Sequence, residues 1–305
     1  MQLESSQHYS CGRFAAERSA ANETPILSRC SSDLRNIKLC DHISRSTSVI
    51  SSLEGSASFE ALRATILADY RSCSKSTDDR RNIFFEGSVV DRSTEIGYDN
   101  IFGPGVVVSS RAKIGSRNIF LSYSQIGVLS PAFANCLTGN LQIGDENVFF
   151  PFSTIEYGTS NGKTTIGDRN RLMKGSHIGH DSKLINDNKV GNFVQTAGYV
   201  TLLNNTNVGS MSMIKQHCIL GDGCFIIPRT DVRDHVSPFT IKSSYPRFNG
   251  RLNIVLLKRM GFNLSEIKIL KTMIKNKTKK SILHSSLIQL YNNSVDIFCE
   301  VTGNS

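Results

Sequence analysis

The fold is decided by a repeating stretch in the middle of the chain, residues 166–221, which reads IGDRNRLMKGSHIGHDSKLINDNKVGNFVQTAGYVTLLNNTNVGSMSMIKQHCILG. An aliphatic residue followed by glycine recurs along this stretch and on its N-terminal side. These pairs begin at Ile96, Ile114, Ile126, Ile143, Ile166, Ile178, Val190, Val208 and Leu220. Six of the eight spacings between them are multiples of six. Such a period is typical of short strands that are separated by regular corners.

One aliphatic residue in every six predicts strands that each point one side chain into a common core. Three hexapeptides complete one triangular coil, and glycine or asparagine at the corners eases the bend of the backbone. We therefore predict a parallel β-helix from about Ile83 to Ile241, with inserted loops at 128–142 and 158–163. Each coil depends on its neighbours for burial.

The two ends of the chain show other patterns. Residues 1–82 are rich in serine and are expected to form a poorly ordered extension of unknown role, with one amphipathic helix at about Ser58–Cys73. Residues 247–305 predict a helical domain that caps the coil, with Gly261 ending its first helix. We expect a second helix after Asn263 or Ser265 and a third at about 280–291. The predicted β-helix domain is 83–246.

Composition limits the class of protein. Hydrophobic residues make up 39% of the chain, enough to bury a core, and no apolar stretch is long enough for a membrane-spanning helix. No apolar run follows the N-terminus, so we expect no secretory signal. The eight cysteines are scattered without a CxxC pair, which argues against a zinc cluster or a disulfide scaffold and favours a cytoplasmic protein.

The net charge of +9 is concentrated at the C-terminal end. The last 59 residues hold ten lysines and arginines but only three acidic residues. This basic end fits a nucleic-acid surface, a solvated helical face or an acidic protein partner.

Two histidines, His177 and His180, fall in one predicted coil on either side of the inward Ile178. Both should project outward beside a corner. Asp181 follows His180 directly and can fix its tautomer, so this pair is a candidate general base. A metal site would need a third convergent ligand, and the nearest other histidine in the sequence is His217, so we expect no metal. The alternative is a pair of exposed histidines without a role.

Three segments carry a resemblance to a known family. They are 166–181 (IGDRNRLMKGSHIGHD), 197–200 (AGYV) and 253–262 (NIVLLKRMGF). The chain resembles the UDP-N-acetylglucosamine O-acyltransferases, which catalyse the first step of lipid A biosynthesis, over about residues 83–275. The resemblance implies a homotrimer of left-handed β-helices with active sites in clefts between neighbouring subunits. It also implies an enzyme that moves a 3-hydroxyacyl group from acyl carrier protein to the 3-hydroxyl of the acceptor sugar.

The resemblance also assigns roles to residues of this chain. His180 matches the catalytic base, Asp181 its partner, and Gly198 the glycine whose backbone N–H stabilises the oxyanion. The substrate-binding positions match His177, Gln216, Asn253 and Arg259, and the position that measures acyl length matches Pro228. No metal or other cofactor is implied. Acyl carrier protein is acidic and would bind the basic C-terminal helices. We therefore expect no nucleic-acid partner.

Several positions depart from the family pattern and bear on the substrate. The residues that replace expected polar or charged groups are Glu156, Tyr199, Lys215, Val255 and Met260, together with Ala132 and Ala134 in the first loop. Pro228 replaces a glycine, and the bulkier residue should shorten the acyl chain accommodated. Two alternatives therefore stay open. One is a related nucleotide-sugar acyl- or acetyltransferase with a short-chain or coenzyme A donor, and the other is a non-catalytic trimeric scaffold.

Overall fold

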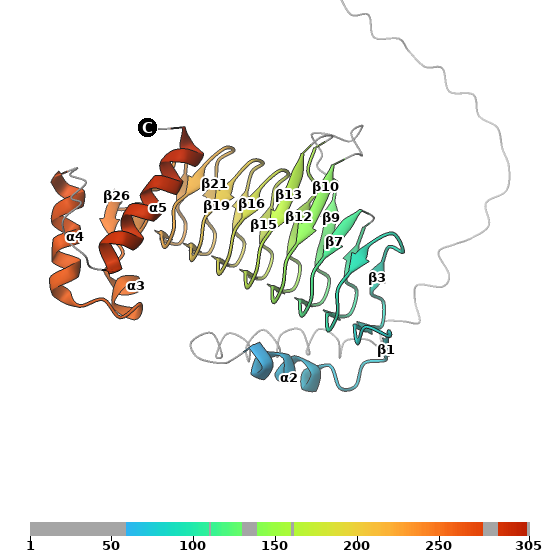
Figure 1. Ribbon diagram of the computed structural model, residues 1–305. Helices are drawn as coiled ribbons and strands as arrows, with labels where there is room; N and C mark the ends of the chain where they lie inside the picture. The colour runs from blue at the N-terminus through green and yellow to red at the C-terminus, as the bar shows by residue number, and fades with distance from the viewer. Residues whose placement is uncertain (1–58, 110, 130–138, 160–161, 277–285, 304–305) are drawn as a thin grey trace, which may run out of the picture. The chain divides into compact units, whose positions relative to one another are not determined.

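Strands stacked coil upon coil form the body of the protein (Figure 1). The computed structural model describes residues 59–109, 111–129, 139–159, 162–276 and 286–303. In this part of the chain the strands make three sheets that are visited in rotation, so each strand pairs with the strand one coil further along. The predicted parallel β-helix is therefore confirmed.

The first sheet, sheet A, contains the strands at both ends of the coil. Its parallel strands begin at β2, and antiparallel strands flank it at each end, β1 beside β2 and β26 beside β25. In spatial order sheet A consists of β1 (Lys75–Thr77), β2 (Ile83–Phe85), β5 (Ile101–Phe102), β8 (Ile119–Phe120), β11 (Val148–Phe149), β14 (Arg171–Leu172), β17 (Lys189–Val190), β20 (Asn207–Val208), β23 (Phe225–Ile226), β25 (Thr240–Ser244) and β26 (Arg247–Leu252).

The other two sheets are parallel throughout. Sheet B consists of β3 (Val89–Val90), β6 (Val107–Val108), β9 (Gln125–Val128), β12 (Thr154–Glu156), β15 (His177–Ile178), β18 (Gln195–Thr196), β21 (Met213–Ile214) and β24 (Asp231–Val232). Sheet C consists of β4 (Glu95–Ile96), β7 (Ala112–Ile114), β10 (Asn140–Ile143), β13 (Lys163–Ile166), β16 (Lys183–Leu184), β19 (Thr201–Leu202) and β22 (Ile219–Leu220). The two predicted loops lie between β9 and β10 and between β12 and β13. Ile143 pairs with both Ile114 and Ile166, so these loops are insertions that leave the register intact.

The core is a column of inward side chains. The aliphatic residues that define the six-residue repeat from Ile114 to Leu220 are all buried. Near the N-terminal end the column becomes aromatic, and neighbouring rings of Phe84, Phe102, Phe120 and Phe149 stack at 4.7–5.0 Å. The inward side chains of each coil are therefore buried by those of the neighbouring coils.

A ladder of buried asparagines holds the corner between sheets C and A. The backbone N–H of Asn100 donates to Asn82 Oδ1 at 2.8 Å, and that of Asn118 donates to Asn100 Oδ1 at the same distance. The ladder runs through Asn82, Asn100, Asn118, Asn147, Asn170 and Asn188. It satisfies backbone groups that the bend removes from the sheets.

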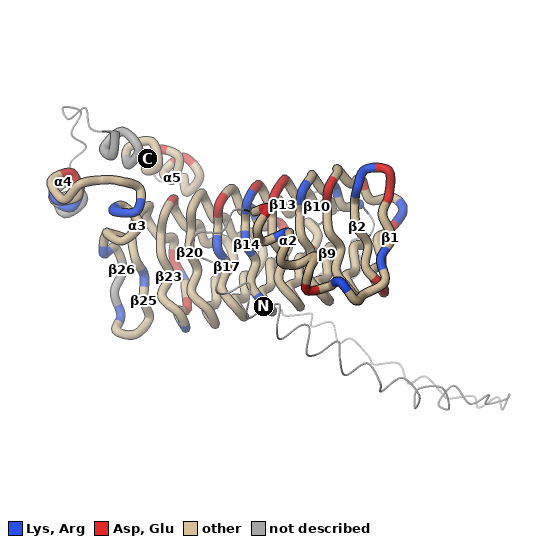
Figure 2. The backbone as a smooth tube through the Cα atoms, turned by 90° about the horizontal axis from the view of Figure 1, so that it is seen from below, with Lys and Arg blue, Asp and Glu red and all other residues tan. Residues whose placement is uncertain are grey.

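The predicted N-terminal helix is confirmed as α2 (Phe59–Asp69), but its position was not expected. In this region the outward side chains of sheet A are apolar, and residues of α2 pack against them. Figure 2 shows α2 lying alongside the coil. Leu62 and Ile66 pack there with Ile101 and Ile119, and the Tyr70 hydroxyl lies 2.7 Å from Ser122 Oγ. Residues 59–77 are therefore part of the folded unit, whereas residues 1–58 lie outside the described residues.

Replacing Ile66 with alanine should loosen α2 without unfolding the coil. The side chain is 1% exposed, and an Ile→Ala change at such a site costs about 2–5 kcal/mol. Hydrogen exchange should therefore become faster in α2 and remain slow in sheets B and C. Thr65→Ala, on the same helix, is the matched control. Unchanged exchange in α2 of the Ile66 variant would contradict this packing.

The described part of the C-terminal region contains three helices, α3 (Ile254–Arg259), α4 (Leu264–Asn276) and α5 (Ser286–Thr302). Asn253 caps α3, and Gly261 follows it with a φ of +89°, as expected for a helix-ending glycine. The predicted start of the second helix is confirmed. The third helix is described from Ser286 and continues to Thr302, beyond its predicted end, and residues 280–285 of its predicted range lie outside the described residues.

Candidate active site

The predicted histidines lie at the corner that links sheet B to sheet C, here named the B–C corner. In successive coils this corner holds Asp181, Tyr199 and His217, with φ values of +57°, +58° and +65°. The backbone N–H of Tyr199 donates to the His180 carbonyl at 2.8 Å. Residues 18 positions apart in the sequence therefore lie directly above one another, which gathers side chains from several coils.

His180 and Asp181 form a buried pair. His180 Nδ1 lies 2.9 Å from Asp181 Oδ2, and both residues are 7% exposed. An ionised carboxylate can only accept hydrogen bonds, so Nδ1 carries a proton, and in the neutral imidazole Nε2 then carries the lone pair. This is the tautomer that a general base requires.

Asp181 is held in turn by the second inserted loop. The Thr159 N–H donates to both carboxylate oxygens at 3.1 Å, and the Asp181 N–H donates to Thr164 Oγ1 at 2.9 Å. Burial would raise the pKa of Asp181, but the hydrogen bonds from His180 and Thr159 together lower it below its ordinary value. The carboxylate is therefore ionised at neutral pH and fixes the imidazole.

Gly198 lies against the ring of His180. A Cβ atom at residue 198 would overlap the imidazole carbon and both of its nitrogens. The close approach requires glycine, and it brings the backbone of residue 198 next to the candidate base. This placement agrees with the oxyanion role that the family resemblance assigns to Gly198, a role that remains a prediction.

His177 lies one strand position before Ile178 and faces outward. Its Nδ1 is 2.8 Å from Thr154 Oγ1, and its Nε2 is 3.7 Å from Glu156 Oε1. The other Glu156 oxygen accepts the His180 N–H at 2.9 Å, so this buried carboxylate joins the two histidines. Glu156 occupies a position where the family pattern has histidine. The register of β12 beside β15 now places it within the site.

Tyr199, another departure from the family pattern, borders His180. Its ring meets the imidazole edge to face with centroids 5.1 Å apart, and it stacks on His217 at 4.8 Å. Tyr199 is 38% exposed, so it forms part of the wall between His180 and solvent. His217 is therefore in contact with Tyr199, a residue of the preceding coil, and the sequence alone does not predict this contact.

The stability of the protein should fall as the pH decreases below about 6.5. Burial lowers the pKa of His177 from its ordinary value of 6.5, and the nearby Glu156 offsets this only in part. The unfolded chain then takes up a proton at a higher pH than the native state, so stability is retained above pH 6.5 and lost below it. In His177→Gln the dependence of the unfolding free energy on pH should be weaker over this range.

Denaturant unfolding at several pH values would measure this effect. Gln195→Ala is the matched control, because Gln195 is the neighbour of His177 on β18 and does not titrate. An equally steep loss of stability in His177→Gln would contradict the assignment.

The remaining predicted residues lie on three different edges of the coil. Gln216 is exposed at the B–C corner, in the bend that also contains His217. Pro228 is exposed at the A–B corner, between β23 and β24. Asn253 lies at the C–A corner, where its Nδ2 donates to the Gly223 carbonyl at 3.0 Å and its Oδ1 caps α3. Arg259 is exposed in the last turn of α3.

A single chain therefore brings His177, Gly198 and Gln216 to the corner of His180 but does not bring Asn253 or Pro228 there. Asn253 also has a structural role that the sequence did not reveal, because both ends of its amide form hydrogen bonds within the chain.

The residues that the structure describes contain no group of three or more histidine, cysteine or acidic side chains suited to a metal ion. The expected absence of a metal or cofactor remains a prediction. None of the described helices is long and apolar enough to cross a membrane.

Comparison of the sequence with known proteins bears on the family. No family model matches the chain. It is 34% identical over 133 residues to the acyl-[acyl-carrier-protein]–UDP-N-acetylglucosamine O-acyltransferase of Alkalilimnicola ehrlichii, covering 43% of this chain and 52% of that protein. It is 32% identical over 154 residues to the enzyme of the same name from Anaeromyxobacter sp. strain K, covering 49% and 60%. The chain thus spans about half the length of the curated relatives it matches.

Comparison of structures bears on the fold. The UDP-N-acetylglucosamine acyltransferase of Francisella novicida matches with a TM-score of 0.58 and 24% identity, over 72% of this chain and 90% of that one. The Moraxella catarrhalis O-acyltransferase matches with a TM-score of 0.57 and 23% identity, over 72% and 95%.

The fold is therefore a left-handed parallel β-helix with a helical C-terminal cap, as the resemblance implied. The resemblance to UDP-N-acetylglucosamine O-acyltransferases, drawn first from three short segments, is confirmed by the sequence matches.

Proposed function

We propose that this protein is an acyltransferase that moves a 3-hydroxyacyl group from acyl carrier protein to the 3-hydroxyl of UDP-N-acetylglucosamine. The observation that carries the proposal is the buried His180–Asp181 pair at the B–C corner. A scaffold gains nothing from a buried, oriented imidazole, so the pair favours catalysis over a purely structural role. The names of the matched relatives supply the donor and acceptor.

The reaction can be derived from the geometry of this pair. A sugar hydroxyl is a weak nucleophile until a base removes its proton. His180 Nε2 takes that proton as the oxygen attacks the thioester carbon, and ionised Asp181 stabilises the resulting imidazolium. The Gly198 N–H stabilises the carbonyl oxygen as it becomes negative. The carbon–sulfur bond then breaks, the thiolate leaves, and the proton on His180 passes to sulfur.

The substrate site would be completed by a neighbouring subunit. Asn253, Arg259 and Pro228 lie away from the B–C corner within one chain. A homotrimer would bring different edges of neighbouring coils together, so that His180 of one subunit faces substrate-binding residues of the next. This arrangement accounts for predicted residues that one chain keeps apart.

The basic C-terminal region would recruit the donor. Lys258, Lys268 and Lys271 are exposed on α3 and α4, and acyl carrier protein is acidic. Complementary charge accelerates such encounters, and salt screens it. We therefore propose a carrier-protein donor, no nucleic-acid partner and a cytoplasmic location.

A related reaction with a short-chain or coenzyme A donor is the second candidate, and Pro228 is the residue that favours it. Pro228→Gly should shift the preferred donor toward longer acyl chains, because glycine removes the ring from the position that measures chain length. The test compares transfer rates for a series of acyl-carrier-protein and acyl-coenzyme A donors in both proteins. An unchanged order of preference would remove Pro228 from the acyl site.

The same donor series tests the proposed function itself. Transfer from acyl carrier protein onto UDP-N-acetylglucosamine, with little from coenzyme A, would support the first candidate. Transfer only from coenzyme A would favour the second. No transfer from any donor, in a protein that is folded and trimeric, would contradict both candidates and favour the scaffold.

A further inference from the structure

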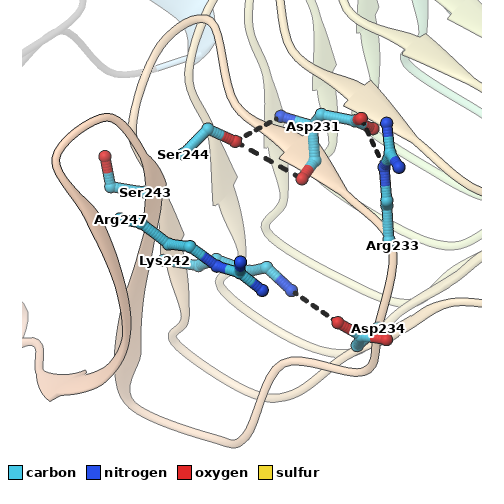
Figure 3. A pocket seen from close by; sticks show the side chains of 7 residues that line it. All are labelled: Asp231, Arg233, Asp234, Lys242, Ser243, Ser244 and Arg247. Atoms are coloured by element: carbon cyan, nitrogen blue, oxygen red, sulfur yellow. Dashed lines mark hydrogen bonds and ion pairs between the residues drawn. The ribbon is translucent and has the colours of Figure 1, made fainter.

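A cavity of about 590 Å³ lies at the C-terminal end of the coil (Figure 3). Its wall contains three cationic and two acidic side chains together with two serines. The lining residues are Asp231, Arg233, Asp234, Lys242, Ser243, Ser244 and Arg247. Asp231 lies three strands along sheet B from His177, which at the usual strand spacing is about 14 Å. The cavity is therefore separate from the His180–Asp181 pair.

Lys242 occupies a position that belongs to the core. On sheet A it pairs with Ile226, which continues a column of buried aliphatic residues through Val208 and Val190. The Lys242 side chain is only 10% exposed. An ammonium group at the end of an apolar column is costly to bury unless an anion compensates it. Lys242 therefore needs an anion close to its ammonium group.

The acidic residues of the cavity compensate the cations only in part. Asp231 is engaged by Arg233, whose Nε lies 2.7 Å from its carboxylate. Asp234 is 3.8 Å from Lys242 Nζ, but its side chain is 80% exposed, so water weakens the attraction. Among the described residues no ion pair is found for Arg247, whose side chain extends from the same hairpin as that of Lys242 in Figure 3. Three cations thus face two carboxylates.

We propose that this cavity binds a phosphate group, held by Lys242 and Arg247. A guanidinium offers paired N–H donors that match two phosphate oxygens, and an ammonium adds a compact positive charge. The serine hydroxyls donate to backbone carbonyls of Tyr245 and Asp231, so they shape the rim and leave the cations as donors. The cavity is large enough for a phosphorylated small molecule as well as for free phosphate.

Isothermal titration calorimetry on the full chain tests the proposal with defined probes. Inorganic phosphate should bind saturably. Two matched pairs, 4′-phosphopantetheine against pantetheine and UMP against uridine, distinguish the source of the phosphate. Tighter binding of one phosphorylated member, if Arg247→Gln weakens it, assigns the cavity to that class of ligand. Equal binding within both pairs, with inorganic phosphate still bound, assigns it to free phosphate.

Variants link the binding to the cavity. Arg247→Gln should weaken phosphate binding about tenfold, because a charge-assisted pair is lost, and the fold should be unaffected since the side chain is exposed. Lys242→Met should have a similar effect while keeping the core position apolar. Lys189→Met, which removes an exposed cation from β17, is the control and should bind as the wild type does. The proposal is overturned if no phosphate probe binds saturably, or if Arg247→Gln binds phosphate as tightly as the control.

Discussion

His180→Ala should lower the rate of acyl transfer by about 10²–10⁴-fold, the usual contribution of a positioned general base. The variant loses the imidazole that Asp181 orients, and the sugar hydroxyl must then be deprotonated by water. His180 points outward at a corner and is not part of the stacked core. The loss should therefore appear in kcat, while the far-ultraviolet circular dichroism and the oligomeric state stay unchanged.

Gln195→Ala provides the matched control for this comparison, since it truncates an exposed side chain of the neighbouring coil. Its rate should remain within about twofold of the wild-type rate, as is usual for a change away from the reacting atoms. A His180→Ala enzyme that retains the wild-type rate would show that the base lies elsewhere.

Ile178→Ala should have the largest effect on folding. Ile178 is fully buried between Ile155 of the preceding coil and Thr196 of the next. Truncation leaves a cavity in the middle of the column, and such a change costs about 2–5 kcal/mol of unfolding free energy. Denaturant titration should show the transition at a lower concentration with a similar slope.

Lys183→Ala is the control for the Ile178 experiment, because Lys183 points outward from β16 and is exposed. Surface changes of this kind usually alter stability by less than about 0.5 kcal/mol. Equal stability of the two variants would mean that the column does not hold the coil together.

The coil itself could be predicted from the sequence because its core is periodic. Each strand contributes one inward side chain, so Ile166, Ile178 and Val190 recur in one six-residue frame. The insertions were also visible, since they interrupt that frame and the six-residue period resumes on their C-terminal side. The period of such a repeat in the sequence therefore predicts how its coils stack in space.

The packing of α2 could not be predicted in this way. Its apolar face was clear from Leu62, Ile66 and Tyr70, but a helical pattern does not name the surface it covers. That surface consists of outward residues of sheet A, such as Ile101 and Ile119, which alternate with the core residues and do not reveal their partner. Contacts between elements far apart in sequence require the structure.

Only part of the site could be predicted, because some of its contacts join residues that are far apart in the sequence. His180 and Asp181 are adjacent in sequence, so their pairing could be inferred from the residues alone. From the sequence alone, Glu156 is only a departure from the family pattern. Its contacts with His177 and His180 depend on the register of β12 beside β15, across an inserted loop. Register between strands is not fixed by local sequence.

The most direct test of the proposed reaction is mass spectrometry of the product. Purified protein is incubated with 3-hydroxyacyl-acyl carrier protein and UDP-N-acetylglucosamine, and the acylated position of the nucleotide sugar is determined. We predict one acyl ester, on the 3-hydroxyl of the sugar, that does not form with His180→Ala. An unmodified nucleotide sugar with every donor tested, or an ester that forms equally with His180→Ala, would contradict acyl transfer at the B–C corner.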